Sequence, residues 1–325
     1  MKFTGIIAIA LSLAFSLGTA RTLAAGDVPR GNDSAGTVDR THVTVSTITF
    51  GIPDPNENVP AFTKAHNLAK AKRLLDIAGQ RGSDIVCLPE LFNSKRTADQ
   101  REAEPIPGGE TSKMLSRAAR KWKMYVLGCY YEKDGDKVYN SVAIFDRTGK
   151  HIGTYHKVHL PPGEDKYATA GDSFPVFQTD FGKIGALVCI DIHFPEAARC
   201  LALQGAEIVF CPTMYSEPRE SITHILYRAR AIENNMFMVC SNYAQRCLDP
   251  HGVHIGFGAI IDRYGEILAN TGRREGVATA VINLDEKCPM AGIDKWGTRR
   301  PDAYGIITES KPGGRTLATP CPTHP

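Results

Sequence analysis

The chain has 325 residues, of which 42% are apolar and 22% are charged, and its formal net charge is +3. These values are typical of a soluble globular protein with one large α/β domain or two small ones. The sequence has no block of five or more Lys or Arg residues, so we expect neither nucleic acid nor an anionic membrane surface as a partner.

The first 25 residues have the three-part pattern of a secretory signal peptide. A positive charge at Lys2 precedes an apolar run over 6–17, and residues 18–20 and 23–25 offer two cleavage sites. The run is shorter than the about 20 residues that span a bilayer. We therefore expect export to the periplasm or the medium and no stable membrane span after cleavage. An uncleaved anchor is the alternative.

The nine cysteines would suggest disulfides in an exported protein. Their placement favours free thiols instead, because five of them lie in or at the end of apolar, strand-like runs: Cys87, Cys129, Cys189, Cys211 and Cys240. The count is odd, so at least one thiol is unpaired. Three others lie in loop-like sequence and could pair in ways that the sequence does not decide: Cys247, Cys288 and Cys321.

A polar segment over 26–42 is predicted to be a linker, and strand-like and helix-like segments alternate after it. In the first half we expect strands at 43–50, 84–88, 124–131, 138–146 and 152–156, and helices at 62–78 and 111–121. In the second half we expect strands at 183–189, 207–211, 236–241, 256–261 and 277–283, and helices at 195–204 and 220–234.

Most of these strands are apolar throughout rather than alternating, which is typical of sheets that are covered on both faces. Strands of this kind separated by helices predict an α/β sandwich in a domain over 43–285. From 286 to 325 the chain is rich in Pro, Gly and charge. We expect this tail to be extended, as an arm onto a partner subunit.

Three strand ends carry residues suited to chemistry: Glu90 in LPELF, Lys157 in YHKVHLPPGE and Cys189 in VCIDIHFPE. Taken singly, each has an ordinary structural interpretation: Glu90 as a loop acid, Lys157 as a solvated lysine and Cys189 as a buried thiol. Active sites of α/β sheets form beyond the carboxyl ends of strands, so the three together predict one site. Because Cys189 stands between a strand and a helix start, backbone N–H groups could hold it as a thiolate.

Other site types have less support. His156 and His159, and likewise His251 and His254, have the spacing of metal ligands, but neither pair has a clear third ligand. We therefore expect no metal. A serine triad is disfavoured because no G-x-S-x-G motif is present.

The segments CLPELF, YHKVHLPPGE and VCIDIHFPE, with YNSVAIFD, GAEIVFCPT and RARAIENNMFMVCSN in support, resemble the nitrilase superfamily of carbon–nitrogen hydrolases. The resemblance implies an α-β-β-α sandwich that pairs into homodimers or higher oligomers. It also implies a Glu-Lys-Cys triad at Glu90, Lys157 and Cys189, with Glu164 as a second acid. It implies no metal or organic cofactor.

These residue types suit hydrolysis of an amide through a thioester. Glu90 would take the thiol proton and Cys189 would attack the carbonyl, while the Ile190 N–H and the Lys157 ammonium hold the oxyanion. Ammonia or an amine would leave, and water activated by Glu90 would release the acid.

The residues after the cysteine bear on the substrate. Similar carbamoylases of D-amino acids carry two arginines where this chain has Ile192 and His193, and nitrilases proper carry Trp-Glu where it has Ile190 and Asp191. An amide or an N-carbamoyl amine is therefore favoured over an N-carbamoyl amino acid or a nitrile. We expect the substrate pocket to include Ile190 and His193, with Met214 and Tyr215 from a neighbouring strand end.

Three alternatives remain open from sequence alone. A nitrile hydrolase is one. An acyltransferase with the same triad is another, although that branch of the superfamily carries many membrane spans. The third is a non-catalytic binding protein on the same fold.

Overall fold

The computed structural model describes residues 41–52, 63–94, 102–215, 220–245, 256–286 and 296–309. The chain divides into two units, Met1–Val38 and Asp39–Pro325, and every described residue belongs to the second. The expected signal peptide and the linker up to residue 40 lie outside the described residues, as do Cys247, Cys288, Cys321, His251 and His254.

The strands form two halves of one hydrogen-bonded network, in the order β5-β4-β3-β2-β1-β9-β8-β7-β6. The first half holds β1 (His42–Ile52), β2 (Ile85–Cys87), β3 (Tyr125–Asp134), β4 (Lys137–Phe145), β5 (His151–His156) and β12 (Gly276–Asn283). The second half holds β6 (Val176–Gln178), β7 (Lys183–Ala186), β8 (Ile208–Pro212), β9 (Phe237–Gln245), β10 (Ala259–Ile261) and β11 (Ile267–Asn270). β1 and β9 pair in parallel and join the halves.

Two helices cover each half: α1 (Lys64–Gln80) and α2 (Glu110–Trp122) cover the first, and α3 (Pro195–Leu203) and α4 (Glu220–Asn234) the second. Local sequence sets their ends. The Thr63 hydroxyl caps α1 by accepting from the His66 N–H at 3.2 Å. Pro195 starts α3, at a position where a missing N–H costs nothing.

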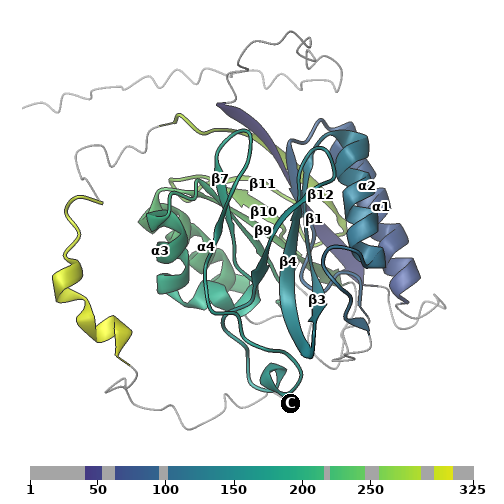
Figure 1. Cartoon of the computed structure of the whole chain (residues 1–325). Coiled ribbons are helices and arrows are strands. Elements are labelled where there is room, and N and C mark those ends of the chain that lie inside the picture. The colour runs from purple at the N-terminus through teal and green to yellow at the C-terminus, as the bar shows by residue number, and fades with distance from the viewer. Residues whose placement is uncertain are drawn as a thin grey trace, which may run out of the picture. The chain divides into compact units, whose positions relative to one another are not determined.

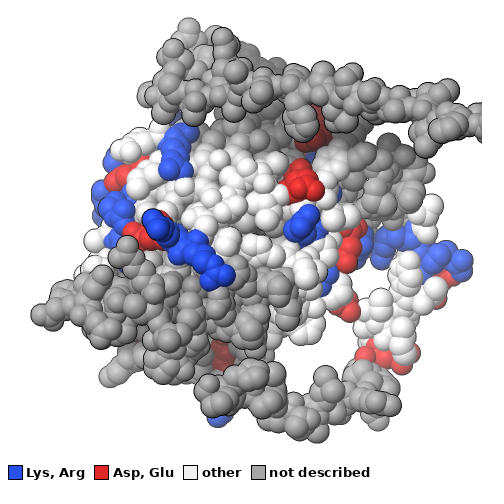
Figure 2. Space-filling view, turned by 180° about the vertical axis from the view of Figure 1, so that it is seen from behind, with Lys and Arg blue, Asp and Glu red and all other residues white. Residues whose placement is uncertain are grey.

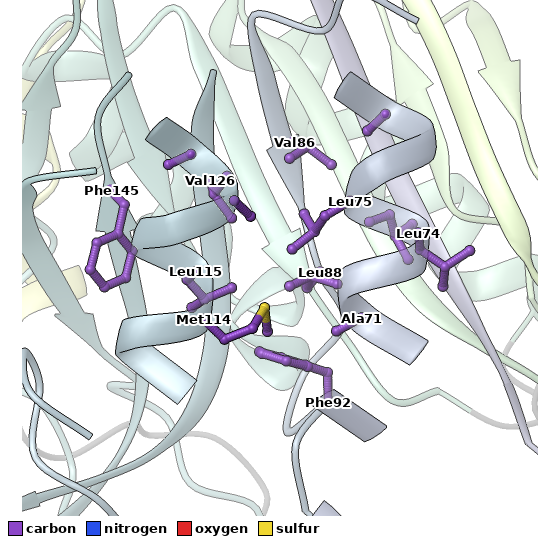
Figure 3. Close-up of a cluster of buried hydrophobic side chains, with 14 of the residues drawn as sticks. Ala71, Leu74, Leu75, Val86, Leu88, Phe92, Met114, Leu115, Val126 and Phe145 are labelled. Carbon is purple, nitrogen blue, oxygen red and sulfur yellow. The ribbon is translucent and has the colours of Figure 1, made fainter. Parts of the chain in front are cut away.

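Apolar side chains fill each interface of this layered arrangement. Residues of α1 and α2 meet those of β2, β3 and β4 in one cluster (Figure 3). A second cluster lies between the two halves of the sheet, and a third joins α3 and α4 to β8 and β9. Figure 1 shows the strands between the two helix pairs. The predicted α-β-β-α sandwich is confirmed.

Burial of the cysteines follows the prediction. Cys87, Cys129, Cys211 and Cys240 are buried free cysteines, and Cys189 is a free cysteine of intermediate burial. Burial raises the pKa of Cys87 to about 12. Thiols of this kind pack as small apolar side chains.

Beyond the sandwich, the described part of the expected tail forms two short 3₁₀ turns, Pro301–Ala303 and Gly305–Thr308. In the part of the chain that the structure describes, no helix is long and apolar enough to cross a bilayer. On the face seen in Figure 2, described Lys and Arg side chains lie beside Asp and Glu. Charges of the two signs are thus interspersed there.

Candidate active site

Glu90, Lys157 and Glu164 form one buried, ion-paired cluster beyond the ends of β2 and β5. The Lys157 ammonium donates to Glu90 Oε1 at 2.9 Å and to Glu164 Oε2 at 2.8 Å. Each of the three residues is at most 6% exposed. The structure therefore brings together both acids and the lysine that the sequence analysis named.

A fourth residue, Asn140 on β4, completes the cluster. Its side-chain amide donates to Glu90 Oε1 and to Glu164 Oε1, each at 2.9 Å. Its own carbonyl oxygen accepts from the Cys129 thiol at 3.2 Å. Asn140 thus bridges the two carboxylates and fixes their separation.

The charges in the cluster depend on one another. Burial alone would lower the pKa of Lys157, but the neighbouring Glu90 and Glu164 carboxylates hold it well above its usual value. Burial raises the pKa of Glu164, although Lys157 and Asn140 oppose the rise. Lys157 is therefore a permanent cation at neutral pH.

The thiol of Cys189 lies against this cluster. Burial raises its pKa well above the usual range, and the Glu90 carboxylate, which is close enough to accept a hydrogen bond from the thiol, raises it further. The Lys157 charge and the Met214 backbone N–H act in the opposite direction. The resting group is thus a thiol, which differs from the predicted thiolate because burial and Glu90 outweigh the nearby donors.

Glu90 and Cys189 both sit at sharp turns. Leu91 and Cys189 each have φ of 50°, a left-handed conformation that is strained for residues other than glycine. A buried tyrosine holds each turn: Tyr243 donates to the Glu90 carbonyl at 2.8 Å and Tyr215 to the Cys189 carbonyl at 2.7 Å. Tertiary contacts thus stabilise the turns that present the two side chains.

The other predicted site residues lie near Cys189 in different ways. Ile190 and His193 belong to the same 3₁₀ turn, Cys189–His193, and are half-buried. Met214 directs its N–H to the sulfur. Tyr215 is 3% exposed, and its hydroxyl and N–H are both used internally, so it supports the nucleophile's turn.

Comparison with known proteins assigns the family. The family model described as carbon-nitrogen hydrolase matches residues 51–287. An N-carbamoylputrescine amidase from Solanum lycopersicum is 34% identical over 74% of this chain and 89% of its own length. An omega-amidase from Xenopus laevis is also 34% identical, over 75% of this chain and 92% of its own. The chain belongs to the carbon–nitrogen hydrolase family.

A solved structure supports the same assignment for this carbon–nitrogen hydrolase. Nit3 of Saccharomyces cerevisiae, a nitrilase-superfamily member, is 27% identical, with a TM-score of 0.70 over 79% of this chain and 97% of that chain. With the relatives above, it places the protein among the carbon–nitrogen hydrolases.

Two residues of the hydrolase site were missed by sequence reasoning. Asn140 is a polar residue inside the apolar strand VYNSVAIF, and that interruption was the available signal. Asp191 follows the nucleophile by two positions and is fully buried. Buried polar groups must find partners, but which partners they find depends on the fold.

The two described histidines that were considered as metal ligands have other partners. His156 pairs with Glu132 at 2.8 Å, and His159 pairs with Asp191 at 2.7 Å. Within the described ranges, no group of three or more His, Cys, Asp or Glu side chains is arranged to hold a metal ion.

Proposed function

We propose that this hydrolase cleaves a linear amide or an N-carbamoyl amine, with Cys189 as nucleophile, Glu90 as general base and Lys157 as the cation that stabilises the oxyanion. The observation that carries the proposal is the buried Lys157 ammonium, fixed between Glu90 and Glu164 and beside the Cys189 sulfur.

In the first step Cys189 attacks the carbonyl carbon while its proton moves to Glu90. Oε1 of Glu90 already accepts from Lys157 and Asn140, so Oε2 is the oxygen that takes the proton. Because the pKa of the thiol is raised by burial, attack needs this base.

The tetrahedral oxyanion needs donors that are already in place. An ammonium has three N–H groups, and Lys157 uses two of them on Glu90 and Glu164. The third is available to the oxyanion, together with the Ile190 backbone N–H. One such donor contributes about 10²–10³-fold to the rate.

Collapse of this intermediate breaks the carbon–nitrogen bond. Glu90 returns the proton to the departing nitrogen, and ammonia or an amine leaves behind an acyl thioester on Cys189. Glu90 then removes a proton from water as the water oxygen attacks the thioester carbonyl, and it passes that proton to the sulfur when the carbon–sulfur bond breaks, which releases the acid and restores the thiol. Glu164 and Asn140 keep Glu90 and Lys157 in place through both halves of the reaction.

The residues after Cys189 narrow the substrate class. Ile192 is fully buried, and its carbonyl accepts from Arg230 at 3.2 Å. A neutral, buried residue cannot anchor a substrate carboxylate, so we expect N-carbamoyl amino acids to be poor substrates. The names of the relatives make N-carbamoylputrescine and terminal amides the first compounds to test.

The test is an ammonia-release assay on purified protein with N-carbamoylputrescine, terminal amides, an N-carbamoyl amino acid and a nitrile. We expect turnover of at least one of the first two classes and none in Cys189→Ala, which should keep the wild-type circular dichroism spectrum and Tm. The matched control is Cys200→Ala, which removes an exposed thiol outside the site and should keep full activity.

Wild-type turnover in Cys189→Ala would exclude the nucleophile assignment. Hydrolysis of the nitrile alone would contradict the substrate class. A folded protein that turns over none of these compounds and binds one of them unchanged would favour a binding role.

Two features of the setting are also proposed. The signal-peptide pattern supports export, which N-terminal sequencing of protein from the medium or periplasm would test.

Exposed apolar side chains on α3 and α4, Leu203 and Ile225, support a homo-oligomer, which light scattering at several concentrations would test.

A further inference from the structure

Asp191 is a fully buried carboxylate that the mechanism above does not use. Its Oδ2 accepts from the Tyr155 hydroxyl at 2.6 Å and from the Val188 N–H at 2.8 Å. Its Oδ1 accepts from the His159 N–H at 3.0 Å and pairs with His159 Nδ1 at 2.7 Å. All four partners act as donors toward a carboxylate, which has no hydrogen to give.

These donors come from the two segments that carry catalytic side chains. Val188 directly precedes the nucleophile. Because the Asp191 N–H also donates to the Val188 carbonyl at 3.1 Å, hydrogen bonds in both directions join Val188 to Asp191 across the turn that contains Cys189. Tyr155 and His159 stand two residues before and two residues after Lys157. One carboxylate therefore ties the cysteine turn to the segment on both sides of the lysine.

Neighbouring contacts make this connection stiff. The Tyr155 hydroxyl also accepts from the Val158 N–H at 3.3 Å. The His159 ring stacks on Phe194, with centroids 3.7 Å apart and planes within 6°, which keeps Nδ1 directed at Asp191. Phe194 is the N-cap residue of α3, directly before Pro195, and it donates its N–H to the Asp191 carbonyl at 3.1 Å.

We propose that Asp191 is a positioning residue, whose carboxylate sets the placement of the Cys189 sulfur relative to the Lys157 ammonium. This inference rests on the proposed function, because it matters only if those two groups act together. This positioning role requires a carboxylate, and a neutral polar side chain of the same size would not fill it. An asparagine side chain has one acceptor oxygen and one NH₂ group. At least one of the four N–H or O–H donors would therefore point at the NH₂ group and lose its hydrogen bond.

The experiment compares Asp191→Asn with Asp262→Asn. Asp262 is a buried carboxylate that accepts two backbone N–H bonds in the β10–β11 turn, at 2.8 and 2.9 Å. Its substitution therefore controls for the general effect of removing a buried carboxylate that stabilises a turn. We expect Asp191→Asn to lower kcat by about 10²-fold, the effect of a misplacement of roughly 1 Å, with KM changed less than about threefold. Asp262→Asn should keep kcat, whatever it does to Tm.

Two further variants separate positioning from stability. His159→Phe keeps the stacking on Phe194 but loses the Nδ1 donor, and Tyr155→Phe loses the hydroxyl alone; both should lower kcat less than Asp191→Asn does. In Asp191→Asn we also expect alkylation of Cys189 to require higher pH than in wild type, because displacing Lys157 removes a charge that favours the thiolate.

Wild-type kcat in folded Asp191→Asn would overturn the proposal. So would an activity loss that only follows the unfolded fraction, with an unchanged pH profile of alkylation in the folded protein. If Cys189→Ala is inactive and Asp191→Asn is fully active, the proposed function stands and this inference fails. If Cys189→Ala is active, the proposed function itself is wrong.

Discussion

At the Cys189 side chain, burial and the Glu90 charge keep the sulfur protonated at rest. A raised thiol pKa means that the reactive thiolate is scarce at pH 7 and becomes more abundant as the pH rises. The nucleophile is thus formed only when Glu90 takes the proton during attack. A thiol is also oxidised less readily than a thiolate, which suits a protein that we propose is exported to an oxidising compartment.

This electrostatic balance predicts an unusual effect of Glu90→Gln. Removing the negative charge takes away a cause of the raised pKa, so iodoacetamide should label Cys189 several-fold faster at pH 8 than in wild type while turnover is lost. Peptide mass spectrometry of the Cys189 peptide measures the labelling rate, with exposed Cys200 as the internal reference. Slower labelling than in wild type would show that Glu90 does not oppose thiolate formation.

Lys157→Met tests the buried ion pairs through stability. It leaves two buried carboxylates without their cation, which should destabilise the fold by about 3–5 kcal/mol at pH 8. The pKa of Glu164 is already raised by burial and rises further without Lys157. A raised acid pKa costs stability as the pH increases through it, so the loss should be smaller at pH 5. Urea unfolding at both pH values measures it, and a loss equal at both would contradict the ion-pair account.

At the scale of helices and strands, most expected elements were confirmed, and the differences have physical causes. A strand was expected through Cys189, but β7 ends at Ala186, because the chain leaves the strand direction to enter the 3₁₀ turn Cys189–His193. The short strands β6 and β11 were not expected. They pair with β7 and β10, and segments of 3 and 4 residues carry too little periodicity to be predicted from sequence.

Asp76 joins the two helices on the first half of the sheet. From α1 it accepts from Lys121 at 2.8 Å and from the Trp122 ring N–H at 2.7 Å, both in α2. Burial opposes ionisation, but these donors, together with Lys72 on α1, lower its pKa to about 2. A lowered acid pKa adds stability above the unfolded pKa that is lost as the pH falls toward 2.

We therefore expect Asp76→Asn to cost about 1 kcal/mol at pH 7, a value reduced by solvent screening, and progressively less below pH 4. Urea unfolding between pH 3 and pH 7 measures the difference. Asp136→Asn, at an exposed turn position, should change little at any pH. A cost for Asp76→Asn that stays constant across this range would exclude the ionic origin.

At the scale of the whole molecule, the sequence was enough to predict the sandwich and the residues Glu90, Lys157, Cys189 and Glu164, which the structure brings together. Each lies in a short local motif, so its position could be recognised without knowledge of its neighbours. The roles of Asn140 and Asp191 could not be predicted in this way. Asn140 acts because β4 places it between two acids, and Asp191 because the halves of the sheet bring Tyr155 and His159 to it.

The whole account depends on a covalent bond between substrate and Cys189. The most direct measurement is intact-mass spectrometry of the enzyme quenched with acid during turnover of a hydrolysed amide, followed by peptide mapping. We expect an adduct with the mass of the acyl group on the Cys189 peptide, accumulating only while substrate lasts and absent in Cys189→Ala. Turnover by a protein that carries no adduct at any quench time, or carries it on another residue, would contradict the account.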